Sequence, residues 1–561
     1  MNINRILNTL VAALSLAAVA PAQTPIIRPA DGEALTRIHT RFRWEPMENV
    51  LSDYVLTVVE DDGTRDPFLS GTVAVSQQVP NAEPRIVITS GLEFGKSYAW
   101  RVVAQVGPAP GTTRFSRTYR FTTQPIPPEL PPLTLTVPQG AGPAQPGVTL
   151  FNVRIGNNPQ TNSAGYAIMV DLAGEIVWFL KYPARRIGDI QQLEDGRLLW
   201  IMNAPNFDEV TGRCVESTID GRLISISPDV PFFYSIHHEV NRMPNGNYLL
   251  LVHDDQVFPG MAAEFWQGDK IIEFDRHTYE PLSEWSVFDD YNLIDYEAQL
   301  GPGCDWTHGN AATYNPLDGS VYFSCRKLTR VTRIDWATKD VVYNMGKIMP
   351  SGDATFGHNL FSFQHAPDPL PNGNLLLFDN GNLIEPLSAP RQSAAVEIAF
   401  NDPNNPTDAQ IVWEHKLVDD NGDPVYGAFL GDADRLPNGN TLICSGPTCL
   451  LHEVDAASNV VWRLQVGAPF PAHSVYRADR IDGVVRDTPG DAEDDWDVDL
   501  RDLATFQNAY AKNGLAFPDT LADTDSDDDV DADDFDFFCF WLTGPSNHLE
   551  DFPLGPTLSC P

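Results

Sequence analysis

Short runs of alternating apolar and polar residues fill the N-terminal part of the chain after residue 23. Alternation places every second side chain on one face of an extended strand, so each run predicts a half-buried β-strand. Trp44 and Trp100 would then pack into one core, and residues 24–123 are expected to form a β-sandwich. The runs lie at residues 42–46, 53–61, 97–105 and 117–123.

Two sequence elements recur in alternation between residues 148 and 485. The first is a strand that meets a turn rich in Pro, Asn and Gly; it lies at 192–201, 242–252, 369–378 and 435–444, with a weaker copy at 314–323. The second is a strand, a turn and a strand ending near Trp; it lies at 169–179, 272–285, 332–343 and 452–462, and in a stretch that ends at 411–413. The Asn-Gly and Asp-Gly pairs predict type I′ hairpin turns, in which both central residues need a positive φ.

Units that recur about every 50 to 70 residues are typical of β-propeller blades, and counting both elements gives six blades. The expected fold is therefore mainly β, with a six-bladed β-propeller over residues 148–485 after the β-sandwich. The Pro-rich stretch at 124–147 predicts an extended, semi-rigid linker between the two.

The first 23 residues have the pattern of a signal peptide. Arg5 precedes an apolar run from Leu7 to Ala20, and small residues then indicate cleavage near residue 22. The run is shorter than the roughly 20 residues of a membrane span, and no other segment could cross a bilayer. We therefore expect a secreted or periplasmic protein.

Export makes disulfides possible for the seven cysteines. Spacing makes three pairs candidates and leaves Cys214 over, although connectivity cannot be read from sequence. The candidate pairs are Cys444 with Cys449, Cys304 with Cys325, and Cys539 with Cys560.

The chain is strongly acidic, with 76 acidic against 37 basic residues and a formal net charge of −39. No excess of Lys and Arg is available to neutralise phosphates, which argues against a nucleic-acid partner. The charge is not evenly spread, because residues 491–536 hold 17 acids and only two bases, Arg501 and Lys512.

The acidic residues of this segment repeat with the spacing of calcium loops. Carboxylates occupy positions 1, 3, 5, 7, 9 and 12 of two loops that start 32 residues apart, and each loop runs into an apolar helix. Alternating oxygens closed by a carboxylate at position 12 suit Ca²⁺, with position 7 normally binding through its carbonyl. The predicted ligands are Asp491, Glu493, Asp495, Asp497, Asp499 and Asp502 in the first loop, and Asp523, Asp525, Asp527, Asp529, Asp531 and Asp534 in the second.

Both ends of the chain resemble known modules. The alternating strands of residues 24–123 resemble a fibronectin type III domain, at the level of pattern. The duplicated loop and helix at 486–545 resemble a dockerin type I module, which implies structural Ca²⁺ and a possible protein partner, and a short tail follows at 546–561. Glu493 and Trp496 depart from the dockerin pattern, so the first site is expected to bind Ca²⁺ more weakly.

Several of the 12 histidines fall at related repeat positions. His238 and His365 each stand six residues before the Pro of the recurring turn, while His308 precedes the weaker copy and His473 lies in the last unit. Inner strands of propeller blades meet around one axis, so these side chains are expected to converge. A single histidine is more often structural, but recurrence at equivalent positions favours a site.

Such a cluster could bind a metal, bind an anion or supply a nucleophile. Three His could hold Zn²⁺, but the sequence has no His-x-His or Glu-x-x-His pair here, and nearby Arg326 would repel a cation. An anion fits better. A metal- or carboxylate-dependent hydrolase is less favoured, since no repeat-aligned Asp or Glu set is evident.

Residues 150–482 resemble the bacterial arylsulfate sulfotransferase family, which consists of secreted six-bladed propellers. The resemblance is carried by residues 237–247, 305–326, 363–382 and 475–481. It implies transfer of a sulfuryl group from an aryl sulfate to a phenolic acceptor, through a sulfurylated histidine and with no cofactor for catalysis. It also implies that His365 is the nucleophile, that His238, His308 and Arg326 bind oxyanions and transfer protons, and that Asn310 contacts substrate; His237 could replace His238.

These residue types suit that reaction, because positioned cationic groups stabilise the charge that develops on transferred oxygens. Arg326 offers two parallel donors to sulfuryl oxygens, and a neutral His365 can attack. The alternative is a non-catalytic secreted propeller that acts as a binding or assembly module. The two hypotheses differ in whether His238, His308, Arg326 and His365 converge.

Overall fold

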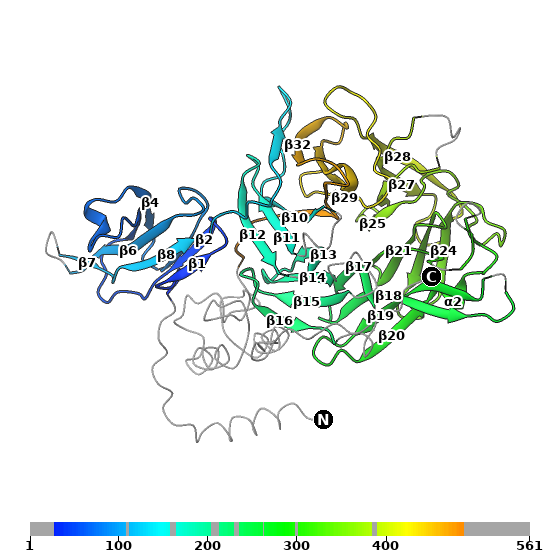
Figure 1. Cartoon of the computed structure of the whole chain (residues 1–561), viewed down its shortest axis with the longest axis horizontal. Coiled ribbons are helices and arrows are strands. Elements are labelled where there is room, and N and C mark those ends of the chain that lie inside the picture. The colour runs from blue at the N-terminus through cyan, green and yellow to red at the C-terminus, as the bar shows by residue number, and fades with distance from the viewer. Residues whose placement is uncertain are drawn as a thin grey trace, which may run out of the picture. The chain divides into compact units, whose positions relative to one another are not determined.

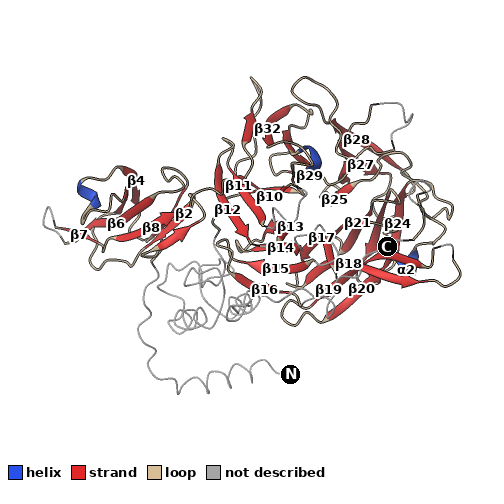
Figure 2. Ribbon diagram, viewed as in Figure 1, coloured by secondary structure: helices blue, strands red, loops and turns tan. Residues whose placement is uncertain are grey.

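The computed structural model describes residues 27–486, except 83, 108–111, 157–163, 184, 204–211, 229–234, 262, 298–300, 304 and 384–389. The predicted signal peptide and calcium module lie outside the described residues. Strands dominate the described part (Figure 2), whose helices are α2 (Val287–Asp290) and the 3₁₀ turns η1 (Pro67–Leu69) and η3 (Gly446–Thr448). No described helix is long and apolar enough to cross a membrane. The chain forms two compact units, which separate near Thr122.

The first unit consists of two antiparallel sheets (Figure 1). One has the strand order β1 (Glu33–Leu35), β8 (Tyr119–Thr123), β6 (Ser97–Gln105), β3 (Tyr54–Glu60), β4 (Val73–Val79), with β7 (Thr113–Phe115) also on β6; the other pairs β2 (Thr40–Arg43) with β5 (Arg85–Ile88). Trp44 and Trp100 are both buried, as predicted. Phe42 packs edge-on against Trp100, with ring centroids 5.3 Å apart. The predicted sandwich core is therefore present.

The second unit consists of six successive antiparallel sheets within the described residues. The first sheet holds β10 (Val148–Ile155), β11 (Gly165–Val170), β12 (Ile176–Tyr182), β33 (His473–Ser474) and β34 (Ala478–Ile481). The second holds β13 (Arg186–Gln192), β14 (Leu198–Asn203), β15 (Arg213–Ser217) and β16 (Leu223–Ile226); the third holds β17 (Ile236–Arg242), β18 (Tyr248–Val257), β19 (Phe265–Phe274) and β20 (Pro281–Ser286).

The remaining three sheets follow the same order. The fourth holds β21 (Gly309–Asn315), β22 (Ser320–Cys325), β23 (Arg330–Asp335) and β24 (Val341–Gly346). The fifth holds β25 (His365–Pro369), β26 (Leu375–Asp379), β27 (Ala394–Phe400) and β28 (Ala409–Lys416). The sixth holds β29 (Asp432–Arg435), β30 (Thr441–Ser445), β31 (Leu450–Val454), β32 (Val460–Val466) and β9 (Leu133–Thr136).

An apolar core lies between each sheet and the next, including the sixth and the first. Both faces of the middle strands are therefore covered, which explains continuous apolar runs such as residues 198–202 in place of strict alternation. Pairing of β10 with β34 joins the two ends of the unit, with Val148 opposite Ile481. The unit is thus a closed, propeller-like ring of sheets.

The predicted linker at 124–147 contains a strand. β9 pairs with β32 as the fifth strand of the sixth sheet, and Leu133 and Leu135 pack against the core between that sheet and the first. Alternating Leu and Thr over 133–136 was the signal for this strand, but the surrounding prolines obscured it. The segment that leads into the ring therefore also supplies a strand to the last sheet of the ring.

The recurring turns are hairpin turns, as predicted, but not of type I′. Gly246 has φ +82°, whereas Asn245 keeps a negative φ, and Gly246 N–H donates to Met243 O. Pro244 stands at the first central position and fixes a negative φ, which type I′ forbids. The turn is therefore a type I turn closed by a glycine bulge.

Two predicted disulfides are wrong. Cys444 and Cys449 are free and buried in the core between the sixth and first sheets. Cys325 is also free, and its Sγ donates to Thr307 O at 3.2 Å. These thiols serve as small apolar side chains. Cys214 is free as predicted, while Cys539 and Cys560 lie outside the described residues.

Candidate active site

Register irregularities near the first strands of the second to fifth sheets shape the site. Such bulges redirect side chains that regular pleating would send elsewhere. His238 and His308 adopt φ values of +59° and +48°, and Ala366 beside His365 adopts +47°. Each left-handed non-glycine residue costs about 1–3 kcal/mol, and such strain gathers at functional sites. The unusual backbone thus coincides with the predicted residues.

His365 is buried at the start of β25, and both of its ring nitrogens are engaged. Nδ1 lies 2.7 Å from Asn380 Oδ1, and Nε2 accepts a hydrogen bond from Leu430 N–H at 3.1 Å. The Asn380 amide group donates to Gly427 O and Leu430 O, which turns its oxygen toward the histidine. His365 therefore carries its proton on Nδ1 and its lone pair on Nε2.

Burial lowers the pKa of His365 well below its usual value, and the charge of Arg326 lowers it further. The ring is therefore neutral near neutral pH, as a nitrogen nucleophile requires. The Leu430 N–H occupies the Nε2 lone pair, so any attack by Nε2 would require this hydrogen bond to lengthen. The same N–H can hold the ring ready before substrate arrives.

Arg326 follows β22 and extends toward the segment that contacts His365. Its NH2 donates to Ala428 O at 3.1 Å, and its guanidinium carbon lies 4.8 Å from the centre of the Phe363 ring. Residues 427–430 thus contact Arg326, Asn380 and His365 together. The geometry places a fixed cation beside the neutral imidazole.

His308 is oriented by a carboxylate. Its Nδ1 lies 2.9 Å from Asp305 Oδ2, which also pairs with Lys327 Nζ at 2.8 Å. Burial raises the pKa of Asp305, but His308 and Lys327 outweigh that effect and hold the pKa below its usual range. An ionised Asp305 keeps the proton on His308 Nδ1.

The His238 ring faces His308, with centroids 5.2 Å apart. Burial lowers the pKa of His238 well below its usual value, and the neighbouring charges of His237, His308 and His365 lower it further. His237 instead stacks on His253, with centroids 3.9 Å apart. The structure therefore brings His238 rather than His237 to the other predicted residues.

Asn310 is buried in β21 and supports the backbone next to His365. Its Nδ2 donates to Gln364 O at 2.8 Å, and its backbone carbonyl accepts from Arg477 NH2 at 3.0 Å. His473 stays apart from the cluster, since its Nδ1 pairs with Ala468 O at 2.9 Å. Four predicted side chains, from His238, His308, Arg326 and His365, thus form the cluster, with Asn310 beneath it.

A set of buried carboxylates near Arg477 was not predicted from the sequence. Arg477 NH2 lies 3.3 Å from Glu239 Oε2, and its NH1 lies 3.9 Å from Asp189 Oδ1. Burial raises the pKa of Asp189 to about 6, and burial also raises that of Asp432. The repeat position of His238 is held by Gly188 and Gly431 in two other sheets. Asp189, Glu239 and Asp432 each stand one residue after it, so the same alignment moved by one residue would have found them. The expectation of no repeat-aligned acid set is wrong.

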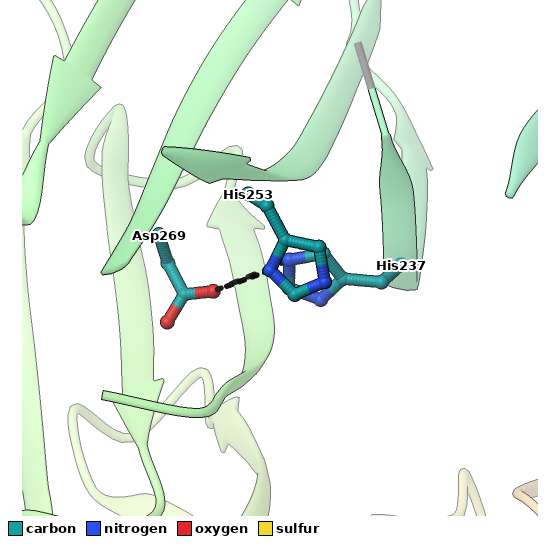
Figure 3. A group of neighbouring side chains, drawn as sticks. All are labelled: His237, His253 and Asp269. Carbon is teal, nitrogen blue, oxygen red and sulfur yellow. Dashed lines mark ion pairs between the residues drawn. The ribbon is translucent and has the colours of Figure 1, made fainter. Parts of the chain in front are cut away.

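Two groups of described residues have metal-ligand atom types within 4.8 Å of one another. One is the acidic group of Asp432, Asp434 and Asp479. The other consists of His237, His253 and Asp269, which lie together (Figure 3). The predicted calcium ligands lie outside the described residues.

Comparison with known families decides the affiliation of this unit. The family model described as Arylsulfotransferase (ASST) matches residues 139–477, more than half of the chain. The chain belongs to the arylsulfotransferase family. The arylsulfotransferase match runs from β10 to β33, includes strands of all six sheets and contains every clustered residue. No curated protein matches the chain.

Three solved structures share distant similarity with this arylsulfotransferase-family chain. A protein of unknown function from Bacteroides caccae is 15% identical, with 59% of this chain and 98% of that chain covered and a TM-score of 0.35. An auxiliary nutrient binding protein from Bacteroides thetaiotaomicron is 11% identical, covering 82% and 92%, with a TM-score of 0.33. A catalytically inactive virginiamycin B lyase from Staphylococcus aureus is 10% identical, covering 59% and 87%, with a TM-score of 0.30.

Proposed function

We propose that the protein is a secreted aryl sulfate sulfotransferase built on a six-bladed β-propeller. It moves a sulfuryl group from an aryl sulfate to a phenolic acceptor, without nucleotide-activated sulfate. The observation that carries the proposal is a buried, neutral His365 with its lone pair on Nε2, next to the cation of Arg326. Family membership supports the same reaction class.

The reaction divides into two steps at His365. In the first, Nε2 forms a bond to sulfur while the bond from sulfur to the aryl oxygen breaks, and His308 or His238 protonates the leaving phenolate. In the second, the acceptor oxygen bonds to sulfur, the bond to Nε2 breaks, and the acceptor proton passes to a histidine. Arg326 pairs with sulfuryl oxygens in both steps.

The clustering of these groups favours an enzyme over a passive binding propeller. Four chemically matched side chains come from the third, fourth and fifth sheets, and strained backbone holds two of the histidines. A binding module would not need a nucleophile with both ring nitrogens oriented.

Turnover with and without an acceptor phenol tests the proposal. Purified protein should release phenol from an aryl sulfate rapidly only when an acceptor is present, since water competes poorly for the intermediate. His365→Asn should lower the rate at least about 10³-fold, because no nucleophile remains. His277→Asn, at an exposed histidine, is the matched control and should keep full activity. Full activity of His365→Asn would contradict the proposal.

We also propose a role for the parts outside the described residues. The signal-peptide pattern supports export, and the two acidic loops support Ca²⁺ binding in a dockerin-like module with a protein partner. Within the described residues, the N-terminal sandwich is proposed as a fibronectin type III-like domain. A chain shortened at residue 486, described in the Discussion, tests the calcium proposal.

A further inference from the structure

A buried carboxylate lies close to His237, one of the two adjacent histidines of β17. Asp269 on β19 is 2% exposed, and its Oδ1 lies 3.2 Å from His237 Nε2 and 3.8 Å from His253 Nδ1 (Figure 3). Burial raises the pKa of Asp269, but its contacts with His237 and other neighbours outweigh this and hold the pKa below the usual value. Asp269 is therefore ionised.

The ring geometry disfavours a metal ion at this group. The His237 and His253 rings stack at 3.9 Å with an angle of 22° between their planes. Imidazole lone pairs lie in the ring plane, so those of stacked rings run nearly parallel. A zinc ion needs them to converge at about 2.0–2.1 Å. The group suits the orientation of a proton better than the coordination of an ion.

The negative charge of Asp269 favours one arrangement of the ring protons on His237 and His238. An ionised oxygen 3.2 Å from His237 Nε2 favours a proton on that nitrogen and repels a lone pair. His237 Nδ1 is then an acceptor, and it lies 2.7 Å from His238 Nδ1. His238 must therefore donate from Nδ1, which leaves its lone pair on Nε2.

The second oxygen of Asp269 supports the other side of the cluster. Oδ2 accepts hydrogen bonds from the Thr307 hydroxyl and from Gly309 N–H. These two residues flank His308, whose φ is +48°. One carboxylate thus connects to His238 through a ring and to His308 through the backbone.

We propose that Asp269 is a positioning residue for the sulfuryl transfer, acting through His237 to make His238 the base that activates the acceptor. The inference rests on the proposed function. In the second step, the acceptor oxygen bonds to sulfur as the bond from sulfur to His365 Nε2 breaks. The acceptor proton moves to His238 Nε2, so His238 becomes a cation, which the Asp269 charge stabilises through His237.

Asp269→Asn keeps the shape of the side chain and removes its charge. With its amide NH₂ toward His237, that ring becomes an acceptor at Nε2 and a donor at Nδ1, so His238 holds its proton on Nε2 and cannot act as a base. Transfer to a weakly acidic phenol should fall about 10²-fold or more. Transfer to a phenol already ionised at the assay pH should fall less than about fivefold, because it needs no base.

The assay is single-turnover transfer from sulfurylated protein to a series of phenols of graded acidity, with the adduct on His365 measured by mass spectrometry. Asp269→Asn should still form the adduct from a donor with an acidic leaving group. An equal loss for all acceptors, or no loss, would overturn the relay. Absence of any adduct in the unaltered protein would instead contradict the proposed function.

Two controls separate positioning from folding. The thermal unfolding midpoint of Asp269→Asn shows whether a loss reflects damage to the third sheet. His253→Phe keeps a ring stacked on His237 but removes the nitrogen that faces Asp269. It should retain transfer to every acceptor. Loss of transfer in His253→Phe, restored by added Zn²⁺, would favour a metal site and refute the relay.

Discussion

The chemistry of single residues was partly readable from the sequence. His238 and His365 occupy one repeat position, so the ring of sheets brings them together although 127 positions separate them. Their partners were not readable. Asn380, which orients His365, directly follows β26, and Asp269, which faces His237, lies on β19. No spacing rule connects a side chain to its neighbour across a sheet.

The environment of His365 predicts how the rate of adduct formation depends on pH below neutrality. In the proposed mechanism only neutral His365 attacks, and burial beside Arg326 lowers its pKa, so the neutral form persists below pH 6.5. The rate of adduct formation should therefore stay constant as pH falls through 6.5 and decline only at lower pH. Rapid-quench measurement of the adduct across pH 4 to 8 checks this. A midpoint at or above pH 6.5 would show that the protein does not lower the pKa of His365.

Individual elements agree with the sequence-based predictions where local residue preferences determine the structure. They differ from those predictions where packing determines it. The Pro-Asn-Gly turns connect the predicted strands, but Pro244 imposes a type I turn with a glycine bulge. The bulges of β17 and β25 leave no pattern in the sequence, because they depend on neighbouring inner strands. These bulges, rather than regular strand geometry, orient His238 and His365.

Gly309 at the start of β21 shows how closely such an element fits. An added Cβ would lie 2.6 Å from the Phe323 ring and 2.8 Å from the Asp269 carboxylate. Gly309→Ala should cost about 1–3 kcal/mol of stability and reduce transfer, since Asp269 must shift. Gly483→Ala, where nothing lies within 4 Å of the new carbon, is the control for thermal unfolding and activity. Equal stability of the two variants would contradict this account.

The whole molecule depends on closure of the ring. Strands β33 and β34 complete the first sheet against β10, and Val475 and Ala478 belong to the core shared with the sixth sheet. The repeat predicted the ring, but not that residues 473–481 would return to residue 148. The net charge of −39 was a poor guide, because it averages the acidic 491–536 segment with a site of histidines and arginine.

Two shortened chains test this division. A chain that ends at residue 486 keeps every described strand, so it should retain sulfuryl transfer and its unfolding temperature while losing Ca²⁺ binding. A chain that ends at residue 472 lacks β33 and β34 and exposes two apolar cores, so it should fail to fold. Calcium titration, thermal unfolding and turnover measure these outcomes. Undiminished Ca²⁺ binding by the 486 chain would refute the calcium proposal, and stable folding of the 472 chain would refute closure.

Mass spectrometry of the protein trapped with an aryl sulfate in the absence of acceptor tests the central claim most directly. We expect one sulfuryl group on the peptide that contains His365, and its disappearance when a phenol is added. Transfer that proceeds with no adduct on His365, or with the group on another residue, would contradict the assignment of His365 as nucleophile.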